Sequence, residues 1–271
     1  VTDQQAESSK LEGNHYFKQQ KFSQAIQAYN TALDYKPSKE ISYRVSLNLC
    51  VVYFETKNLD SCISQASLIL QNNPDDPKAL CWLAKAYSTK EQELRKGKKD
   101  DQVPEVTDIQ TNVSGETGYV YGALAMHFSN SENSNKIQNS LRTSGLVMTQ
   151  TRVVPVHSER ELEQALQDAT RERAKRNWGL PGERHVVLVR SGTYRVDQLI
   201  WQSLFCTTVI GSLSGPKPIF LIEKENMTLI CKQIFINLHF KMKDAQLFIC
   251  LQDQSPMCFQ WCKFESFAPI N

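Results

Sequence analysis

Three short stretches near the start of the chain decide its fold: Gly13-Asn14-His15-Tyr16, Cys50-Val51-Val52-Tyr53 and Ala84-Lys85-Ala86-Tyr87. In each stretch a small residue lies three positions before a tyrosine, and the three tyrosines recur at a nearly constant step. A period of about 34 residues is typical of helix pairs that stack into a solenoid, because one pair alone cannot bury its apolar face. The hollow side of a solenoid binds other proteins, so the sequence predicts a binding protein.

The residues between these stretches predict paired helices. Residues 6–36 predict two helices, and residues 41–57 and 59–72 repeat the design with apolar side chains three and four apart. Pro37 and Pro74 end the first two units, since proline does not continue a helix. A third unit begins near Leu80, but its second helix is not evident. We expect residues 119–128 to be a helix that packs in its place.

This region, residues 5–98, resembles the tetratricopeptide repeat (TPR) family. The residues that carry the resemblance occupy its small, aromatic and proline signature positions: Gly13, Tyr16, Ala25, Tyr29, Ala32 and Pro37, then Cys50, Tyr53, Cys62, Ala66 and Pro74, then Leu83, Ala84 and Tyr87. The resemblance implies an all-α solenoid in which small residues allow two helices to approach closely and aromatic residues fill the grooves between pairs.

The same resemblance implies a binding site. Heat-shock co-chaperones of this family hold the C-terminal Glu-Glu-Val-Asp tail of cytosolic chaperones with lysine, asparagine and arginine side chains, an arrangement called a carboxylate clamp. The positions that match here are Lys10, Asn14, Asn48 and Lys78, and Trp82 occupies the fifth, basic position. Lysines supply charge and asparagine amides donate directional hydrogen bonds to carboxylates. A tryptophan in place of arginine removes bidentate recognition and weakens or redirects binding.

An alternative for these residues stays open. Lys10 and Lys78 are then ordinary exposed lysines, and Asn14 and Asn48 reflect only the ancestry of the repeats. We regard binding of some extended acidic peptide as better supported than binding of one named chaperone.

Residues 99–152 are rich in polar side chains and show little periodicity apart from 119–128, so we expect a mostly flexible linker. The basic residues Arg95, Lys96, Lys98 and Lys99 are expected to be a solvated helix end, with a nuclear address as the alternative.

Residues 153–271 have a different pattern. Ser158 and Glu161 form a capping box for a helix over residues 158–176. Short runs of branched and aromatic residues follow. Some recur 20 residues apart, since Leu229 follows Val209 and Phe220 follows Ile200 at this interval. This order resembles a right-handed parallel β-helix with an N-terminal capping helix, of the pectin-lyase-like superfamily and its scaffold members. We expect the first turns of such a coil, with further turns beyond the sequence.

The rival class is a carbohydrate-active enzyme, a polysaccharide lyase or hydrolase on the β-helix with the repeats as a docking module. The available acids Asp197, Asp244 and Asp253 share no spacing, and His157, His185 and His239 are isolated. The spacing of Cys258 and Cys262 lacks the second pair that a zinc site needs. We therefore expect no enzyme activity, no metal and no cofactor.

Composition sets outer bounds. The net charge of +2 is too small to indicate nucleic acid or an acidic membrane surface as partner. No apolar run approaches the roughly 18–20 residues of a membrane span, and eight scattered cysteines suit a reducing compartment. The sequence as a whole predicts a cytoplasmic multidomain α + β adaptor, with the nucleus as a second location, whose TPR groove binds a protein or peptide.

Overall fold

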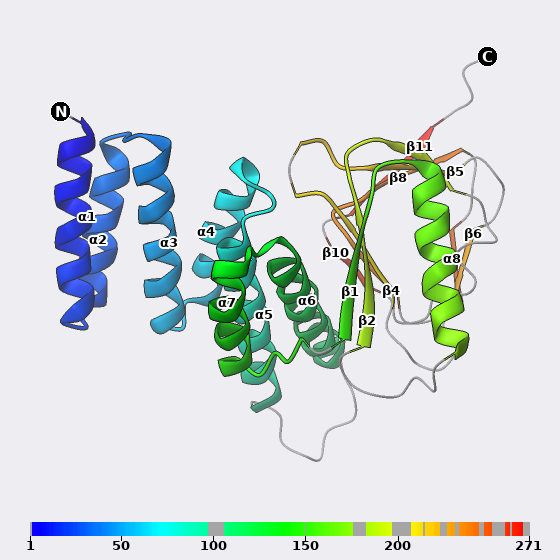
Figure 1. Ribbon diagram of the computed structural model, residues 1–271, viewed down its shortest axis with the longest axis horizontal. Helices are drawn as coiled ribbons and strands as arrows, with labels where there is room; N and C mark the ends of the chain where they lie inside the picture. The colour runs from blue at the N-terminus through cyan, green and yellow to red at the C-terminus, as the bar shows by residue number, and fades with distance from the viewer. Residues whose placement is uncertain are drawn as a thin grey trace. The chain divides into compact units, whose positions relative to one another are not determined.

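The chain divides into two units, Val1–Leu146 and Val147–Asn271, which are described separately (Figure 1). The computed structural model describes residues 2–96, 106–148, 150–175, 183–196, 207–213, 215–222, 227–230, 233–243, 247–250, 258–260 and 262–267.

The first unit is built of helices, and consecutive helices pack against each other. The described helices are α1 (Thr2–Lys18), α2 (Phe22–Asp34), α3 (Lys39–Glu55), α4 (Leu59–Asn72), α5 (Pro77–Lys96), α6 (Val106–Phe128) and α7 (Ser131–Thr143). Helices α1, α3 and α5, the first members of three successive pairs, also contact one another, α1 with α3 and α3 with α5. The helical solenoid predicted from the tyrosine-marked stretches is thus present in the N-terminal region.

Glycine is required in the first pair because two helices approach closely there. A Cβ atom on Gly13 would lie 2.6 Å from the Tyr29 ring. That ring is 2% exposed and belongs to a core that also holds Ala25, Val45 and Leu49. The small-residue position of the repeat therefore exists to admit the tyrosine of the following helix.

The first two pairs turn in the same way. After α1, the Lys21 backbone N–H donates to the Tyr16 carbonyl at 3.0 Å, and the residue before Lys21 has a φ of 59°. After α3, the Asn58 N–H donates to the Tyr53 carbonyl at 2.9 Å, and the residue before Asn58 has a φ of 60°. This bond satisfies a carbonyl that a helix end leaves unpaired. The two tyrosines therefore occupy equivalent places in successive repeats.

The third pair is completed by α6. The ring of Tyr121 on α6 is fully buried and stacks on Tyr87 of α5, with centroids 5.8 Å apart and planes 15° apart. Gly118 allows this contact, since a Cβ there would lie 3.0 Å from the Ala84 carbonyl oxygen. The 119–128 segment is thus part of a longer helix over Val106–Phe128 that packs along α5.

The linker expected over residues 99–152 is wrong for residues 106–118, which belong to α6, and for Ser131–Thr143, which forms α7. The Asn130 side chain caps this helix by accepting from the Asn133 N–H at 2.9 Å. Ile137 and Leu141, four positions apart, are 5% and 1% exposed, and both α5 and α6 contact the helix. Two apolar residues in a polar stretch were too weak a pattern to reveal it.

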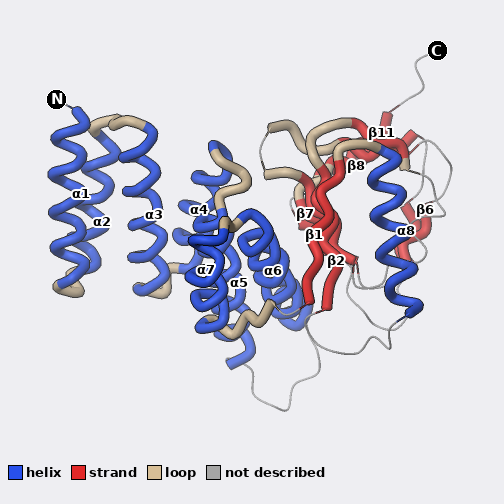
Figure 2. The backbone as a smooth tube through the Cα atoms, viewed as in Figure 1, coloured by secondary structure: helices blue, strands red, loops and turns tan. Residues whose placement is uncertain are grey.

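The described residues of the second unit combine one helix with short strands, and all the described strand pairings are parallel. Its elements are β1 (Gln150–Val156), α8 (Glu159–Lys175), β2 (Glu183–Val189), β3 (Thr193–Arg195), β4 (Thr207–Gly211), β5 (Ile219–Ile222), β6 (Met227–Ile230), β7 (Gln233–Ile236), β8 (His239–Lys243), β9 (Leu247–Cys250), β10 (Cys258–Gln260) and β11 (Lys263–Phe267). Figure 2 shows the strands in red and α8 beside β1 and β2, which it contacts.

The strands that the structure describes form three sheets, of order β1-β2-β4-β7-β10, β3-β5-β8-β11 and β6-β9. In each sheet the spatial order follows the chain order, as expected when each layer of strands is laid on the previous one. Strands β1, β8 and β11 were missed from the sequence, and the expected strand at residues 199–201 lies outside the described residues. The constant interval seen in the sequence also gave a wrong partner for one strand, because Val209 lies beside Phe235 and not beside Leu229.

An aromatic column lies on one face of the β3-β5-β8-β11 sheet. Tyr194, Phe220, Phe240 and Phe264 are neighbours in register on β3, β5, β8 and β11. Successive ring centroids are 6.0, 5.6 and 5.1 Å apart, distances at which aromatic pairs attract beyond simple burial. The first three rings are at most 2% exposed and Phe264 is 43% exposed.

The Ser158 half of the predicted capping box at the start of α8 is present, whereas the Glu161 carboxylate reaches past the cap to the residue before it. The Ser158 hydroxyl accepts from the Glu161 N–H at 3.3 Å, and the Glu161 carboxylate accepts from the His157 N–H at 2.7 Å.

We expect Ser158→Ala to lower the stability of the second unit by about 1 kcal/mol, because a helix-end donor loses its acceptor. Hydrogen exchange of the 159–169 amides measures this, and Ser158→Asp, which keeps an acceptor, is the control. Equal protection of Ser158→Ala and wild type would contradict the prediction.

Candidate functional site

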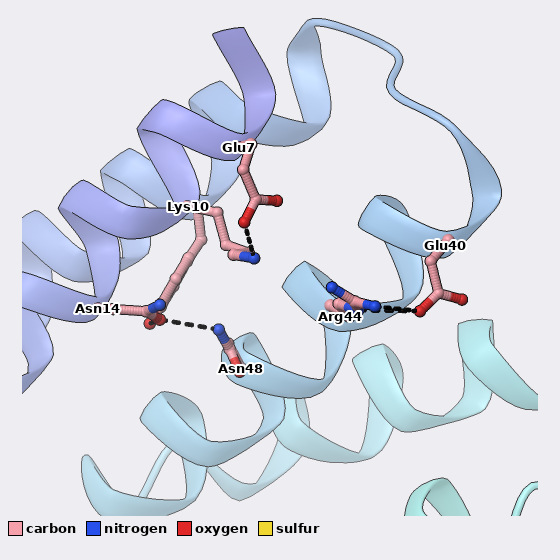
Figure 3. A network of polar contacts seen from close by, with 7 residues as sticks. Glu7, Lys10, Asn14, Glu40, Arg44 and Asn48 are labelled. Carbon is pink, nitrogen blue, oxygen red and sulfur yellow. Dashed lines mark hydrogen bonds and ion pairs between the residues drawn. The ribbon is translucent and has the colours of Figure 1, made fainter. Parts of the chain in front are cut away.

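Three of the five predicted site residues gather between α1 and α3 (Figure 3). Lys10 and Asn14 are four positions apart on α1 and therefore share a helix face. Asn48 lies on α3, and its amide Nδ2 donates to Asn14 Oδ1 at 2.9 Å. The repeat period thus brings together two asparagines that belong to successive repeats.

The Asn14 side chain is held in one orientation. Its Oδ1 accepts a second hydrogen bond, from the Tyr29 hydroxyl at 2.7 Å, so this oxygen has two donors. The carbonyl end of the amide is therefore used within the protein. The Nδ2 group carries two N–H donors, and within the described parts of the chain no acceptor is assigned to them. The site consequently presents donors, which is what a carboxylate ligand requires.

Lys10 is buried, at 8% exposed, and its ammonium pairs with the Glu7 carboxylate one turn earlier on α1. The alternative that Lys10 is an ordinary exposed lysine is therefore wrong. Because Glu7 is 39% exposed at its side chain, this pair lies at the boundary between protein and solvent. An incoming carboxylate would share the Lys10 ammonium with Glu7 or replace Glu7 as its partner.

The other two predicted residues lie on α5, and the described contacts do not join them to the first three. Lys78 is exposed, one residue after the start of the helix. Trp82 is half-buried, and its ring packs on Phe54 of α3 with centroids 5.5 Å apart. The described site is therefore a hydrogen-bonded group on α1 and α3 and a separate aromatic group on α3 and α5.

Several residues at the site were missed from the sequence. Tyr29 was assigned only to packing, and its hydroxyl proves to orient Asn14. Lys85 lies over the Trp82 ring, with Nζ 4.2 Å from the ring centroid. Arg44, one turn before Asn48, pairs with Glu40 at 2.8 Å. A helical projection of α5 would have found Lys85, since it follows Trp82 by three positions.

Burial shifts the pKa of two of these groups. It raises the pKa of the Tyr29 phenol, so the hydroxyl stays a donor to Asn14 throughout the physiological range. It lowers the pKa of the Lys85 ammonium, because the charged form is less well solvated there.

The second unit offers a different polar cluster, around Glu265. The carboxylate lies 2.9 Å from His239 Nε2, 3.5 Å from Lys263 Nζ and 3.8 Å from Lys241 Nζ. One carboxylate among bases lacks the acid pair of a glycosidase or the acidic cluster of a calcium site. The acids weighed from the sequence, Asp197, Asp244 and Asp253, lie outside the described residues.

Among the described residues, no three histidine, cysteine, aspartate or glutamate side chains are placed to hold a metal ion. None of the described helices has both the length and the apolar character needed to cross a bilayer.

Comparison with known proteins finds similarity within the first unit. A tetratricopeptide repeat family model matches residues 16–86. The Hsp70-Hsp90 organising protein of Plasmodium falciparum (isolate 3D7) is 30% identical over 84 residues, which are 31% of this chain and 14% of that protein. The chain thus spans about a seventh of that relative's length.

A solved structure also matches, the C-terminal TPR-containing domain of a Plasmodium falciparum FK506-binding protein. It is 23% identical, the match covers 53% of this chain and 88% of that domain, and the TM-score is 0.37. The family match and the helix geometry together show that the N-terminal region contains tetratricopeptide repeats.

Proposed function

We propose that the chain is a protein-interaction adaptor whose TPR unit, residues 5–98 with α6 packed on it, binds an acidic peptide through its C-terminal carboxylate. The observation that carries this proposal is the fixed amide of Asn14. Its oxygen is occupied by Tyr29 and Asn48, so its N–H donors are left for a ligand, on the helix face that also bears Lys10.

The two lysines of the predicted site favour the same ligand. Lys10 and Lys78 are the cations proposed to attract the carboxylates, and Asn14 and Asn48 are proposed to give it direction. Trp82 removes the bidentate partner that the co-chaperone resemblance implies, so we propose a broader choice of acidic tails than one chaperone. No catalytic step is proposed, since binding is the whole of the mechanism.

The proposal places the protein in the cytoplasm, where chaperone tails are found. Support comes from the thiols Cys50, Cys62 and Cys81, which are free and buried, as is usual in a reducing compartment.

For the second unit we propose the first turns of a right-handed parallel β-helix that offers a second binding surface. Support comes from the parallel pairing and from a strand order that follows the chain in each sheet. Parallel strands in one sheet are almost always joined by right-handed crossovers, which sets the hand of the coil.

Titration of the chain with a labelled peptide ending in Glu-Glu-Val-Asp tests the proposed ligand. We expect a Kd on the order of micromolar and a loss of at least tenfold for Asn14→Ala, since hydrogen bonds to a charged group contribute about 1.5–3 kcal/mol. Asn30→Ala, which removes an exposed asparagine of α2, is the matched control and should bind as wild type.

The same peptide with an amidated C-terminus separates specific from general attraction. It keeps the acidic side chains and loses the terminal charge, so we expect at least tenfold weaker binding. No binding of either peptide, or equal binding of both, would reject the proposed function.

A further inference from the structure

A second cationic group lies on α5, beside the residues assigned above. The Lys85 ammonium lies 4.2 Å from the centroid of the Trp82 ring and 4.7 Å from that of Phe54. The two rings themselves are 5.5 Å apart and inclined at 54°. Lys85 is thus held between an aromatic ring of its own helix and one of the preceding repeat.

Lys85 differs from Lys10 and Arg44 in the groups that hold its charge. Lys10 pairs with Glu7, and Arg44 pairs with Glu40. For Lys85, no carboxylate lies within ion-pair distance in the described parts of the chain. Aromatic faces attract an ammonium group without accepting its strong hydrogen bonds, so its three N–H donors stay available. The Glu55 carboxylate attracts this half-buried ammonium only from beyond ion-pair distance, and an anionic ligand group would supply the direct partner that Glu55 does not.

The position of Lys85 relates it to the proposed groove. Lys78, Trp82 and Lys85 lie at positions i, i+4 and i+7 of α5, which form one face of a helix. Lys85 is about 10 Å along the helix axis from Lys78, at roughly 1.5 Å per residue. An extended peptide covers that distance with about three residues. The two lysines are therefore spaced to contact two acidic groups of one extended chain.

We propose that Lys85, held by Phe54 and Trp82, binds an acidic side chain of the peptide about three residues from the group that Lys78 contacts. This inference rests on the proposed function and adds to it a requirement for an internal acidic residue. The rings of Phe54 and Trp82 contact the aliphatic part of the same peptide segment. The position that lacks arginine thereby gains a different source of positive charge, one turn further along α5.

The test is a double-mutant cycle with the full chain. The two peptides end in Glu-Glu-Val-Asp and Gln-Gln-Val-Asp, both with free C-termini. We expect Lys85→Met, which keeps an apolar stem and removes the charge, to weaken the first peptide about tenfold and the second less than twofold. Lys85→Arg, which keeps the charge, should bind the first peptide within about threefold of wild type.

Lys90→Met is the matched control, because Lys90 lies on the same helix and pairs with Asp60 at 2.6 Å. It should leave both affinities unchanged, and circular dichroism should be the same for all variants. If Lys85→Met binds both peptides as wild type does, or weakens both equally, the inference is wrong while the proposed function stands. If the wild-type chain binds neither peptide, the proposed function fails and the inference with it.

Discussion

Replacing Tyr29 by alanine should lower the free energy of unfolding of the TPR unit by about 3–5 kcal/mol, the usual cost of removing a buried aromatic ring. The ring is 2% exposed and fills the space that Gly13 leaves between α1 and α2. Its hydroxyl also donates to Asn14, so the change both creates a cavity and releases the Asn14 amide. Urea unfolding followed by circular dichroism measures the loss.

Tyr29→Phe separates the two roles. It keeps the ring and removes the hydrogen bond, so we expect a loss of about 1 kcal/mol in stability. Peptide binding should weaken a few-fold, because the Asn14 amide loses one of the two partners that orient it. If Tyr29→Phe is as unstable as Tyr29→Ala, the ring is not the source of the stability. If it binds peptide like wild type, Asn48 alone orients Asn14.

The second large effect is expected at the end of β4. A Cβ atom on Gly211 would lie 2.2 Å from the Asn237 carbonyl oxygen and 2.8 Å from Pro218 Cδ. Backbone cannot yield as a flexible side chain does, so Gly211→Ala has to shift one layer of strands against the next. We expect a loss of about 3 kcal/mol or more, at the upper end of the cost of overpacking. Thermal unfolding of the full chain measures it.

Gly192→Ala is the control for this prediction. An added Cβ there would lie 3.3 Å from the edge of the Tyr194 ring, and the site is exposed. We expect a change below about 1 kcal/mol. A Gly211→Ala variant with the stability of Gly192→Ala would mean that the strand layers are more loosely packed than the structure indicates.

The sequence alone predicted most of the helical unit because its repeat places equivalent residues at equivalent points. The contact between Asn14 and Asn48 follows from that period. The bond from Tyr29 to Asn14 does not, since it depends on how closely α1 and α2 approach and on the rotamer of the ring. The burial of Lys10 was also missed, although Glu7 one turn earlier is a spacing at which ion pairs form.

The strand unit was predicted less completely, for a different reason. Short apolar runs located most strands, but the partner of each strand depends on the length of the connections between layers. The interval that separates Val209 from Leu229 does separate Leu229 from its partner Ile249. Val209 itself, however, is paired with Phe235, which lies further along the chain than Leu229. One fixed period therefore could not give the register, and β1 escaped because it precedes the capping helix.

The aromatic column has a consequence for how this unit tolerates change. Its members, Tyr194, Phe220, Phe240 and Phe264, are unequally spaced along the chain, and yet each ring lies directly against the next. Backbone pairing and ring contact thus align the same four residues, although the number of residues between them differs from one step to the next. Segments outside the column are free to lengthen, shorten or acquire new chemistry over evolutionary time while the stack keeps its order. In this unit, sequence changes are expected mainly outside the column, and few are expected at its four aromatic residues.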